Sequence, residues 1–357
     1  MGFKCGIVGL PNVGKSTLFN ALTNSSKAQA ENFPFCTIDP NIGIVAVPDE
    51  RLNKISSISK STKTINAAIT FVDIAGLVKG ASKGEGLGNK FLSHVREVDT
   101  IIHLTRCFDS EKIQNVNKDV DPIRDLEIIE TEILLSDLES LQKRLEKSNK
   151  KKLEKDELNL LEDSHKLISD GKNLDELKKK YNKDLIKKSA LLSLKPRIIV
   201  CNVDEKSLPD GNKYSNNCKK KFSKENIIIV CADIEDQIMS LHAKDRKDFM
   251  FESGIKSTGL DNLIKTGYKT LGLSTFFTSG PEESRAWTIQ NNSKASDAAG
   301  VIHSDFKKKF IRAETVTSDD FIKYKGFNEC KNAGKLRLEG KDYAVNDGDV
   351  MYFRVGS

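Results

Sequence analysis

One nine-residue stretch near the start of the chain constrains the fold more than any other feature of the sequence. Residues 9–17 read Gly-Leu-Pro-Asn-Val-Gly-Lys-Ser-Thr and contain the pattern Gly-x-x-x-x-Gly-Lys-Ser. The apolar run at residues 3–8 predicts a buried strand before it, and residues 18–22 predict the first turns of a helix after it. A glycine-rich loop between a strand and a helix surrounds phosphate groups with backbone N–H donors. The stretch therefore predicts a phosphate-binding P-loop in an α/β fold.

The residue types in this loop suit the chemistry of a nucleoside triphosphate. Gly9 and Gly14 let the backbone adopt positive φ and approach a ligand closely. Lys15 is expected to reach the β and γ oxygens, which also makes it a catalytic candidate, and the Ser16 hydroxyl can bind Mg²⁺. Backbone amides at the start of a helix can point toward a bound anion. The expected nucleotide contacts in this loop are Asn12, Val13, Gly14, Lys15, Ser16 and Thr17.

A second group of candidate residues lies around the end of a later strand. Residues 68–72 predict a strand, and Asp73 follows at its C-terminal end, where Mg²⁺ and the γ-phosphate meet in P-loop proteins. We expect Asp73 to hold the ion through a water molecule and Thr37, in the preceding loop, to complete its ligands. Gly76 offers its amide to the γ-phosphate. These parts respond together to the presence or absence of that phosphate.

The stretch after this group is rich in glycine. Residues 80–88 hold four glycines in nine positions, so they cannot form a rigid element without support from elsewhere. One interpretation is a mobile switch loop over the phosphates, because the stretch comes shortly after Asp73. The other interpretation is a plain flexible connector.

The base of the nucleotide is expected to bind where two later strands end, at residues 196–201 and 227–231. The first strand leads into Asn202-Val203-Asp204-Glu205, where P-loop GTPases usually carry Asn-Lys-x-Asp. Val203 therefore replaces the lysine, and Glu205 replaces the aspartate that accepts two hydrogen bonds from guanine. The extra methylene moves the carboxylate by ~1.5 Å, and a buried donor pair left unmatched costs ~1–3 kcal/mol.

These replacements predict a loss of guanine selectivity. Adenine presents an N6 donor beside the N7 acceptor, which a side-chain amide such as that of Asn202 can match. The second strand ends in Cys231 and Ala232, which complete the expected base-binding loops.

Three stretches make a family resemblance specific. Residues 9–17, 32–41 and 73–89 resemble the YchF/Obg-like ATPase family, a branch of the translation-factor-related P-loop GTPases, and the likeness extends over nearly the whole chain. The resemblance implies a doubly wound P-loop sheet with an inserted helical coiled-coil hairpin and a C-terminal β-grasp (TGS) domain. It also implies a preference for ATP over GTP, with the backbone of Val203 as a nucleotide contact. We expect the protein to be a monomer. The implied partner is the ribosome or its RNA, in translation or a stress response.

The residue that positions the attacking water is not obvious from the sequence. Many GTPases place a glutamine after Asp-x-x-Gly, but this chain has Leu77, and the family is similar in carrying a hydrophobic residue there. Several relatives have a histidine in the stretch aligned with residues 113–115, where this chain has Gln114. We therefore predict slow intrinsic turnover that a partner or a cation such as K⁺ accelerates. The catalytic candidates are Lys15, Asp73, Gly76, Leu77 and Gln114.

The chain is expected to divide into a nucleotide-binding domain at residues 1–272, a helical insert at 111–195 and a C-terminal module at 273–357. In the insert, leucines at 134, 138, 141 and 145 recur at coiled-coil spacing. Residues 275–281 are interpreted as a linker into the C-terminal module, which shows short strand patterns around one helix. Lysines of both parts could contact RNA phosphates, or they could form solvated charged faces.

The net charge, the cysteine content and the longest apolar runs narrow the class of protein. The chain of 357 residues has a net charge of +6, which permits RNA binding without arguing for it. Its seven cysteines show no Cys-x-x-Cys pair, which is typical of reduced thiols in a cytoplasmic protein. No signal peptide and no apolar run of membrane-spanning length is apparent.

Three functions remain distinguishable on this sequence. The first is an Mg²⁺-dependent ATPase switch that also accepts GTP and reports to ribosomes. The second is a GTP-preferring regulatory GTPase. The third is a nucleotide-gated RNA- or protein-binding scaffold with incidental hydrolysis. A different P-loop enzyme, such as a kinase, is disfavoured by the switch at residues 73–76 and by the base-binding loop.

Overall fold

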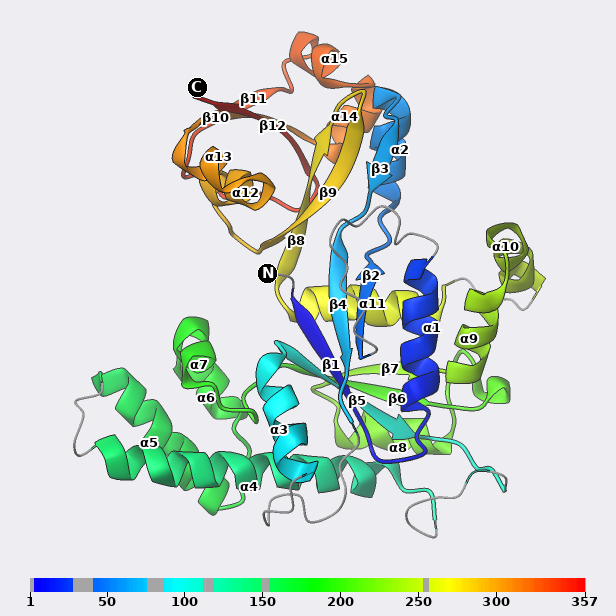
Figure 1. Ribbon diagram of the computed structural model, residues 1–357, viewed down its shortest axis with the longest axis vertical. Coiled ribbons are helices and arrows are strands. Elements are labelled where there is room, and N and C mark those ends of the chain that lie inside the picture. Colours follow the sequence, from blue (N-terminus) through cyan, green and yellow to red (C-terminus); the bar gives the residue numbers. More distant parts are fainter. Residues whose placement is uncertain are drawn as a thin grey trace.

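Two six-stranded sheets and the helices around them make up the described part of the chain (Figure 1). This computed structural model describes residues 3–27, 41–75, 87–111, 113, 119–148, 154–252 and 257–356. The first sheet forms the centre of a doubly wound α/β unit, and the second lies mainly in the C-terminal part of the chain. The predicted α/β fold class is therefore confirmed.

The first sheet has the strand order β2-β4-β1-β5-β6-β7. Its strands are β1 (Lys4–Val8), β2 (Ile42–Ala46), β4 (Ala68–Asp73), β5 (Thr100–Arg106), β6 (Arg197–Asn202) and β7 (Asn226–Val230). Strand β2 is antiparallel to β4, whereas β4, β1, β5, β6 and β7 run parallel. Parallel strands with helices on both faces are buried along their whole length, and β5 is buried at every position, its polar residues included.

Helices cover both faces of this sheet, and the alternation of side chains along β6 shows how. Ile198 and Val200 join the main core with residues of α11 (Gly259–Thr270). Ile199 and Cys201 belong to a separate cluster with residues of α4 (Pro122–Ser148) and α8 (Lys213–Lys221). The helices of this unit are α1 (Lys15–Lys27), α3 (Leu87–Glu97), α8 (Lys213–Lys221), α9 (Ala232–Ser240), α10 (Ala243–Glu252) and α11 (Gly259–Thr270), with a short 3-10 helix η3 (Glu205–Ser207).

The expected helical insert is present and has its own apolar core. It consists of α4 (Pro122–Ser148), α5 (Lys155–Ser169), α6 (Asp175–Lys180) and α7 (Lys183–Ser189). Helix α4 contributes Ile129 to the main core and Leu141 to the insert core, where it meets Leu160 of α5. Among the described residues, no helix is both long enough and apolar enough to cross a membrane.

The second sheet has the strand order β11-β10-β12-β8-β9-β3. Its strands are β3 (Lys63–Ile65), β8 (Leu273–Ser279), β9 (Glu283–Gln290), β10 (Phe310–Thr317), β11 (Arg337–Glu339) and β12 (Asp349–Val355). The helices near it are α12 (Ala295–Ile302), α13 (Ser304–Lys308), α14 (Ser318–Tyr324) and α15 (Phe327–Asn332). The linker interpretation of residues 275–281 is wrong, because most of this stretch lies in β8, where Phe276 and Phe277 are fully buried.

Residues 50–65 leave the first α/β unit and add a strand to the second sheet. Helix α2 (Glu50–Ser59) leads into β3, which pairs in parallel with β9. Nearby, an Arg51 Nη1 atom lies 2.8 Å from Asp347 Oδ2. The sequence pattern predicts no helix or strand here, because the stretch is polar and β3 is only three residues long. The domain division at residue 272 stays a prediction, and this segment crosses it.

Candidate nucleotide-binding site

The P-loop leaves β1 and enters α1 with positive φ at Gly14, as predicted, whereas Gly9 lacks the predicted positive φ and Asn12 has one instead. Asn12 and Gly14 have φ values of 66° and 92°, both in the left-handed region. A Cβ atom at Gly14 would lie 2.3 Å from Asn202 Nδ2, and one at Gly9 would lie 2.8 Å from the Leu104 carbonyl oxygen. Both glycines are therefore required by close approach, and Gly14 is also required by its φ.

The side chain of Asn202 holds this loop in place. Its Nδ2 donates to the Val13 carbonyl oxygen at 2.9 Å, and its Oδ1 accepts the Ala232 backbone N–H at 3.0 Å. The Asn202 carbonyl oxygen accepts the Cys107 N–H at 2.8 Å. The residue is only 5% exposed, so these bonds are shielded from water. The sequence pattern predicts that the Asn202 amide contacts the base. Its bonds to Val13 and Ala232 leave no signal in the sequence, because these partners are distant along the chain.

Lys15 and Asp73 are brought together as an ion pair and a hydrogen bond between Nζ and Oδ1. Lys15 begins α1, and Asp73 ends β4, whose register places it beside Ile7 of β1. Both side chains remain accessible at 14% and 18% of their surfaces. The arrangement presents one cation and one carboxylate at the mouth of the P-loop, as a phosphate and a divalent cation require.

The remaining P-loop candidates lie at the start of α1. Ser16 is exposed, and Thr17 is half-buried, within the first turn of this 13-residue helix. Unpaired N–H groups and the helix dipole make such a turn favourable for anions. Four other predicted residues, Thr37, Gly76, Leu77 and Gln114, lie outside the described residues.

The predicted base-binding residues occupy neighbouring loops at the ends of β6 and β7. Val203, Cys231 and Ala232 are each less than 5% exposed, and the Val203 N–H donates to the Val230 carbonyl oxygen at 2.8 Å. Burial raises the pKa of the Cys231 thiol, so it stays neutral. Glu205 is exposed at the start of η3, where its carboxylate is free to meet a ligand.

The fold and this site define a P-loop nucleotide-binding protein of the GTPase class. Residues 4–132 match the family model MMR_HSR1, described as "50S ribosome-binding GTPase". Residues 273–356 match the family model YchF-GTPase_C, described as "Protein of unknown function".

Full-length relatives identify the family within this class. The chain is 48% identical to "Ribosome-binding ATPase YchF" of Bacillus subtilis and 47% identical to the protein of that name from Escherichia coli O157:H7, over 99% of both chains in each case. The solved structure of the Schizosaccharomyces pombe YchF GTPase superposes with a TM-score of 0.89 at 38% identity, covering 99% of this chain and 98% of the other. The chain belongs to the YchF family, as the sequence resemblance indicated.

Proposed function

We propose that the chain is an Mg²⁺-dependent ATPase that also accepts GTP and acts as a ribosome-associated regulatory switch in translation or a stress response. The observation that carries the proposal is the Lys15–Asp73 pair at a P-loop held by Asn202. The ribosome is proposed as the partner because the bacterial relatives are named ribosome-binding ATPases. The protein is then a cytoplasmic monomer.

The residues present fit a magnesium ion. Ser16 offers an exposed hydroxyl, and Asp73 offers a carboxylate next to the phosphate-binding Lys15. Hard oxygen donors of this kind, with water and phosphate oxygens, are what Mg²⁺ prefers. Ser16 would bind it directly, Asp73 through water, and Thr37 would complete the set. When bound, the ion neutralises charge on the β and γ oxygens. A dependence on K⁺ stays a prediction.

Each protein group then has a definite part in hydrolysis. A water molecule attacks the γ-phosphorus, the bond to the β–γ bridging oxygen breaks, and ADP and phosphate leave. Lys15 would exchange Asp73 for the phosphate oxygens and stabilise their charge. Gly76 would donate its amide to the γ-phosphate. Since Leu77 cannot orient water, Gln114 or a ribosomal group would position it, so intrinsic turnover should be slow.

The experiment that tests nucleotide choice is calorimetric competition between ATP and GTP on the purified protein. We expect ATP to bind more tightly, because the longer Glu205 side chain displaces the carboxylate that would pair with guanine. The Glu205→Asp variant should gain affinity for GTP relative to the unaltered chain. Equal or tighter GTP binding by the unaltered chain would overturn the ATP preference and favour a GTP-preferring regulatory GTPase.

A second experiment separates hydrolysis from nucleotide-gated binding. Ribosomes should accelerate single-turnover hydrolysis, and fast hydrolysis that ribosomes leave unchanged contradicts the proposed switch. If the chain is a scaffold with incidental hydrolysis, changes at Leu77 or Gln114 should leave cellular function intact. The Lys15→Ala change should destroy function under either interpretation.

A further inference from the structure

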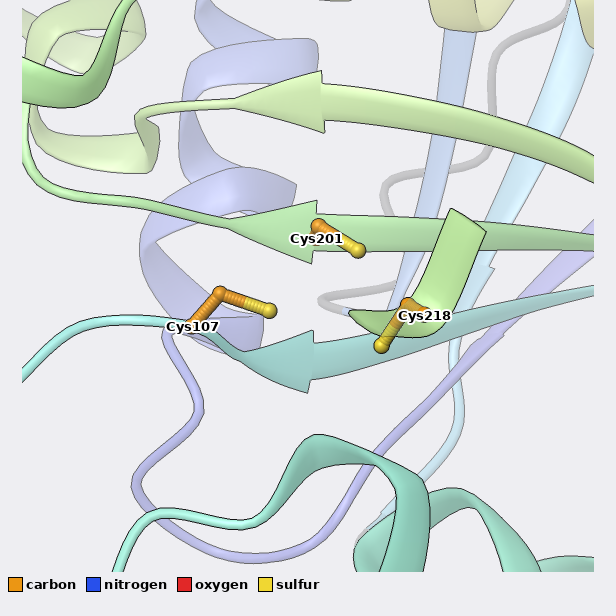
Figure 2. Close-up of side chains that lie close together, drawn as sticks. All are labelled: Cys107, Cys201 and Cys218. Atoms are coloured by element: carbon orange, nitrogen blue, oxygen red, sulfur yellow. The ribbon is translucent and has the colours of Figure 1, made fainter. Parts of the chain in front are cut away.

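Three buried cysteines lie close together where the C-terminal ends of β5 and β6 face α8. Cys107 follows β5, Cys201 lies in β6, and Cys218 lies in α8; each has 0% of its surface exposed. Their sulfur atoms all lie within 4.8 Å of one another. Figure 2 shows the three side chains converging on the space between the two strands and the helix. No sequence motif predicts this group, because its three cysteines are far apart along the chain.

The surrounding backbone fixes where the three side chains start. Cys201 is opposite Thr105 in the β5–β6 register, and the Cys107 N–H donates to the Asn202 carbonyl oxygen. Asn212 caps α8, and its Nδ2 also donates to the Cys107 carbonyl oxygen at 2.7 Å. The two strand ends and the helix are thus joined independently of the thiols, and the three sulfur positions form a preorganised set.

The group is enclosed by apolar side chains. Leu126, Ile199 and Val203 belong to the same buried cluster. Among the described residues, no further histidine, cysteine or carboxylate joins these three sulfurs as a potential metal ligand. Hydrogen bonds from Cys107 and Cys201 lower the pKa of Cys218, while hydrogen bonding to the other two thiols and burial raise the pKa of Cys107. The three sulfur atoms are thus close enough for each thiol to change the pKa of its neighbours.

Charge decides which ion such a site can hold. A structural zinc ion takes four ligands, and three thiolates would leave it one ligand short and with net negative charge. Soft Cu(I) accepts thiolates, but three of them would leave two negative charges in an apolar cluster. Isolated charges are strongly disfavoured there. A trivalent thiophilic ion with three thiolates is neutral.

We propose that Cys107, Cys201 and Cys218 form a three-thiol site for trivalent arsenic, the neutral complex that this apolar enclosure favours. Thiolate sulfurs that share one ion at a bond length of ~2.3 Å lie within ~4 Å of one another, so the observed spacing needs only small side-chain adjustments. Arsenous acid and three thiols give three As–S bonds, while three As–O and three S–H bonds break and three water molecules leave. No atom changes oxidation state.

Binding by the unaltered protein is tested with arsenite on the reduced full-length chain. After gel filtration we expect one arsenic per chain and a mass gain of one arsenic less three hydrogens. Binding to a preformed native site raises the thermal midpoint, whereas binding to thiols of the unfolded chain lowers it. Zn²⁺ or Cu⁺ should not be retained in equal amount. No retained arsenic, or a lowered midpoint, overturns the proposal.

The variants Cys107→Ala, Cys201→Ala and Cys218→Ala locate the site. Each should lose the retained arsenic and the thermal shift while still binding ATP, which shows that it is folded. The matched control is Cys330→Ala, which removes a buried cysteine of α15 outside the group. Its arsenic retention should equal that of the unaltered chain. Equal retention by Cys218→Ala and the unaltered chain places the arsenic elsewhere and contradicts the proposal.

Discussion

The side-chain amide of Asn202 donates to the backbone carbonyl oxygen of Val13 at 2.9 Å, joining positions 189 residues apart in the sequence. The same amide accepts the N–H of Ala232, at the start of α9. The phosphate-binding loop and both base-binding loops thus share one buried side chain. A change in one of these loops must therefore affect the geometry of the other two.

Replacement of Asn202 by alanine should weaken both the fold and nucleotide binding. The change leaves the Val13 carbonyl and the Ala232 N–H without a partner, and each unsatisfied buried group costs ~1–3 kcal/mol. Urea unfolding should show the loss of stability, and calorimetry should show weaker ATP binding. The control is Asn217→Ala, an exposed position of α8. If the Asn202→Ala protein is destabilised but binds ATP with unchanged affinity, Asn202 supports the fold without shaping the nucleotide site, and this prediction is wrong.

Lys15→Ala should weaken ATP binding and abolish turnover without unfolding the protein. The lysine leaves Asp73 to meet the phosphates, and a hydrogen bond to a charged group contributes ~1.5–3 kcal/mol, or roughly 10–100-fold in affinity. Asp73→Asn should behave differently, because it removes the carboxylate and keeps the lysine: ATP should still bind with EDTA present, but added Mg²⁺ should no longer enhance binding. Calorimetry with and without Mg²⁺ distinguishes the two outcomes. Normal turnover by Lys15→Ala would contradict the site.

The stability of the protein should fall as the pH rises because of Glu235. This residue of α9 is 4% exposed, its Oε1 accepts the Gly259 N–H at 2.5 Å, and its Oε2 has no hydrogen-bond partner among the residues that the structure describes. Burial raises its pKa to about 7, and the nearby Asp261 acts in the same direction. The folded state therefore holds a proton that the unfolded state has lost, from the ordinary glutamate pKa up to about 7.

The contribution of Glu235 to the free energy of unfolding is complete below the glutamate pKa of the unfolded state and is lost as the pH rises through the pKa of the folded state. This contribution should differ by about 3 kcal/mol between acidic pH and pH 8. Glu235→Gln keeps the acceptor for Gly259 and should flatten this part of the profile, with a gain in stability at pH 8. Urea unfolding at pH 5, 6.5 and 8 measures it, with the exposed Glu162→Gln as control. A profile of Glu235→Gln that parallels the unaltered chain would refute the assignment.

The parts of the molecule that sequence predicts are those with local signals. The P-loop has a fixed spacing, Asp73 follows a strong apolar run, and residues 100–105 predict the buried strand that the structure shows as β5. Strand β3 has three residues and pairs with β9 more than 200 residues later, so it leaves no local pattern. The Asn202 bonds and the cysteine group likewise depend on neighbours that only folding brings together.

The attachment of the helical insert to the sheet gives a last prediction, centred on Asp137. This carboxylate of α4 is fully buried, and it accepts the Leu192 N–H at 3.0 Å, the Ser193 N–H at 2.8 Å and the Ser193 hydroxyl at 2.6 Å. Asp137→Ala leaves these donors of the segment before β6 unsatisfied, so it should destabilise the protein by roughly 2–5 kcal/mol. Hydrogen exchange at residues 191–194 should accelerate more than exchange in β1.

The matched control for Asp137 lies on the same helix. Glu139 pairs with Lys143 on the surface, where both side chains are more than 60% exposed, and exposed ion pairs contribute little to stability. Glu139→Ala should therefore change neither the urea midpoint nor the exchange at residues 191–194. Equal effects of the two variants would mean that the segment before β6 is held by its apolar contacts with the insert core, through Leu191 and Leu194, rather than by Asp137.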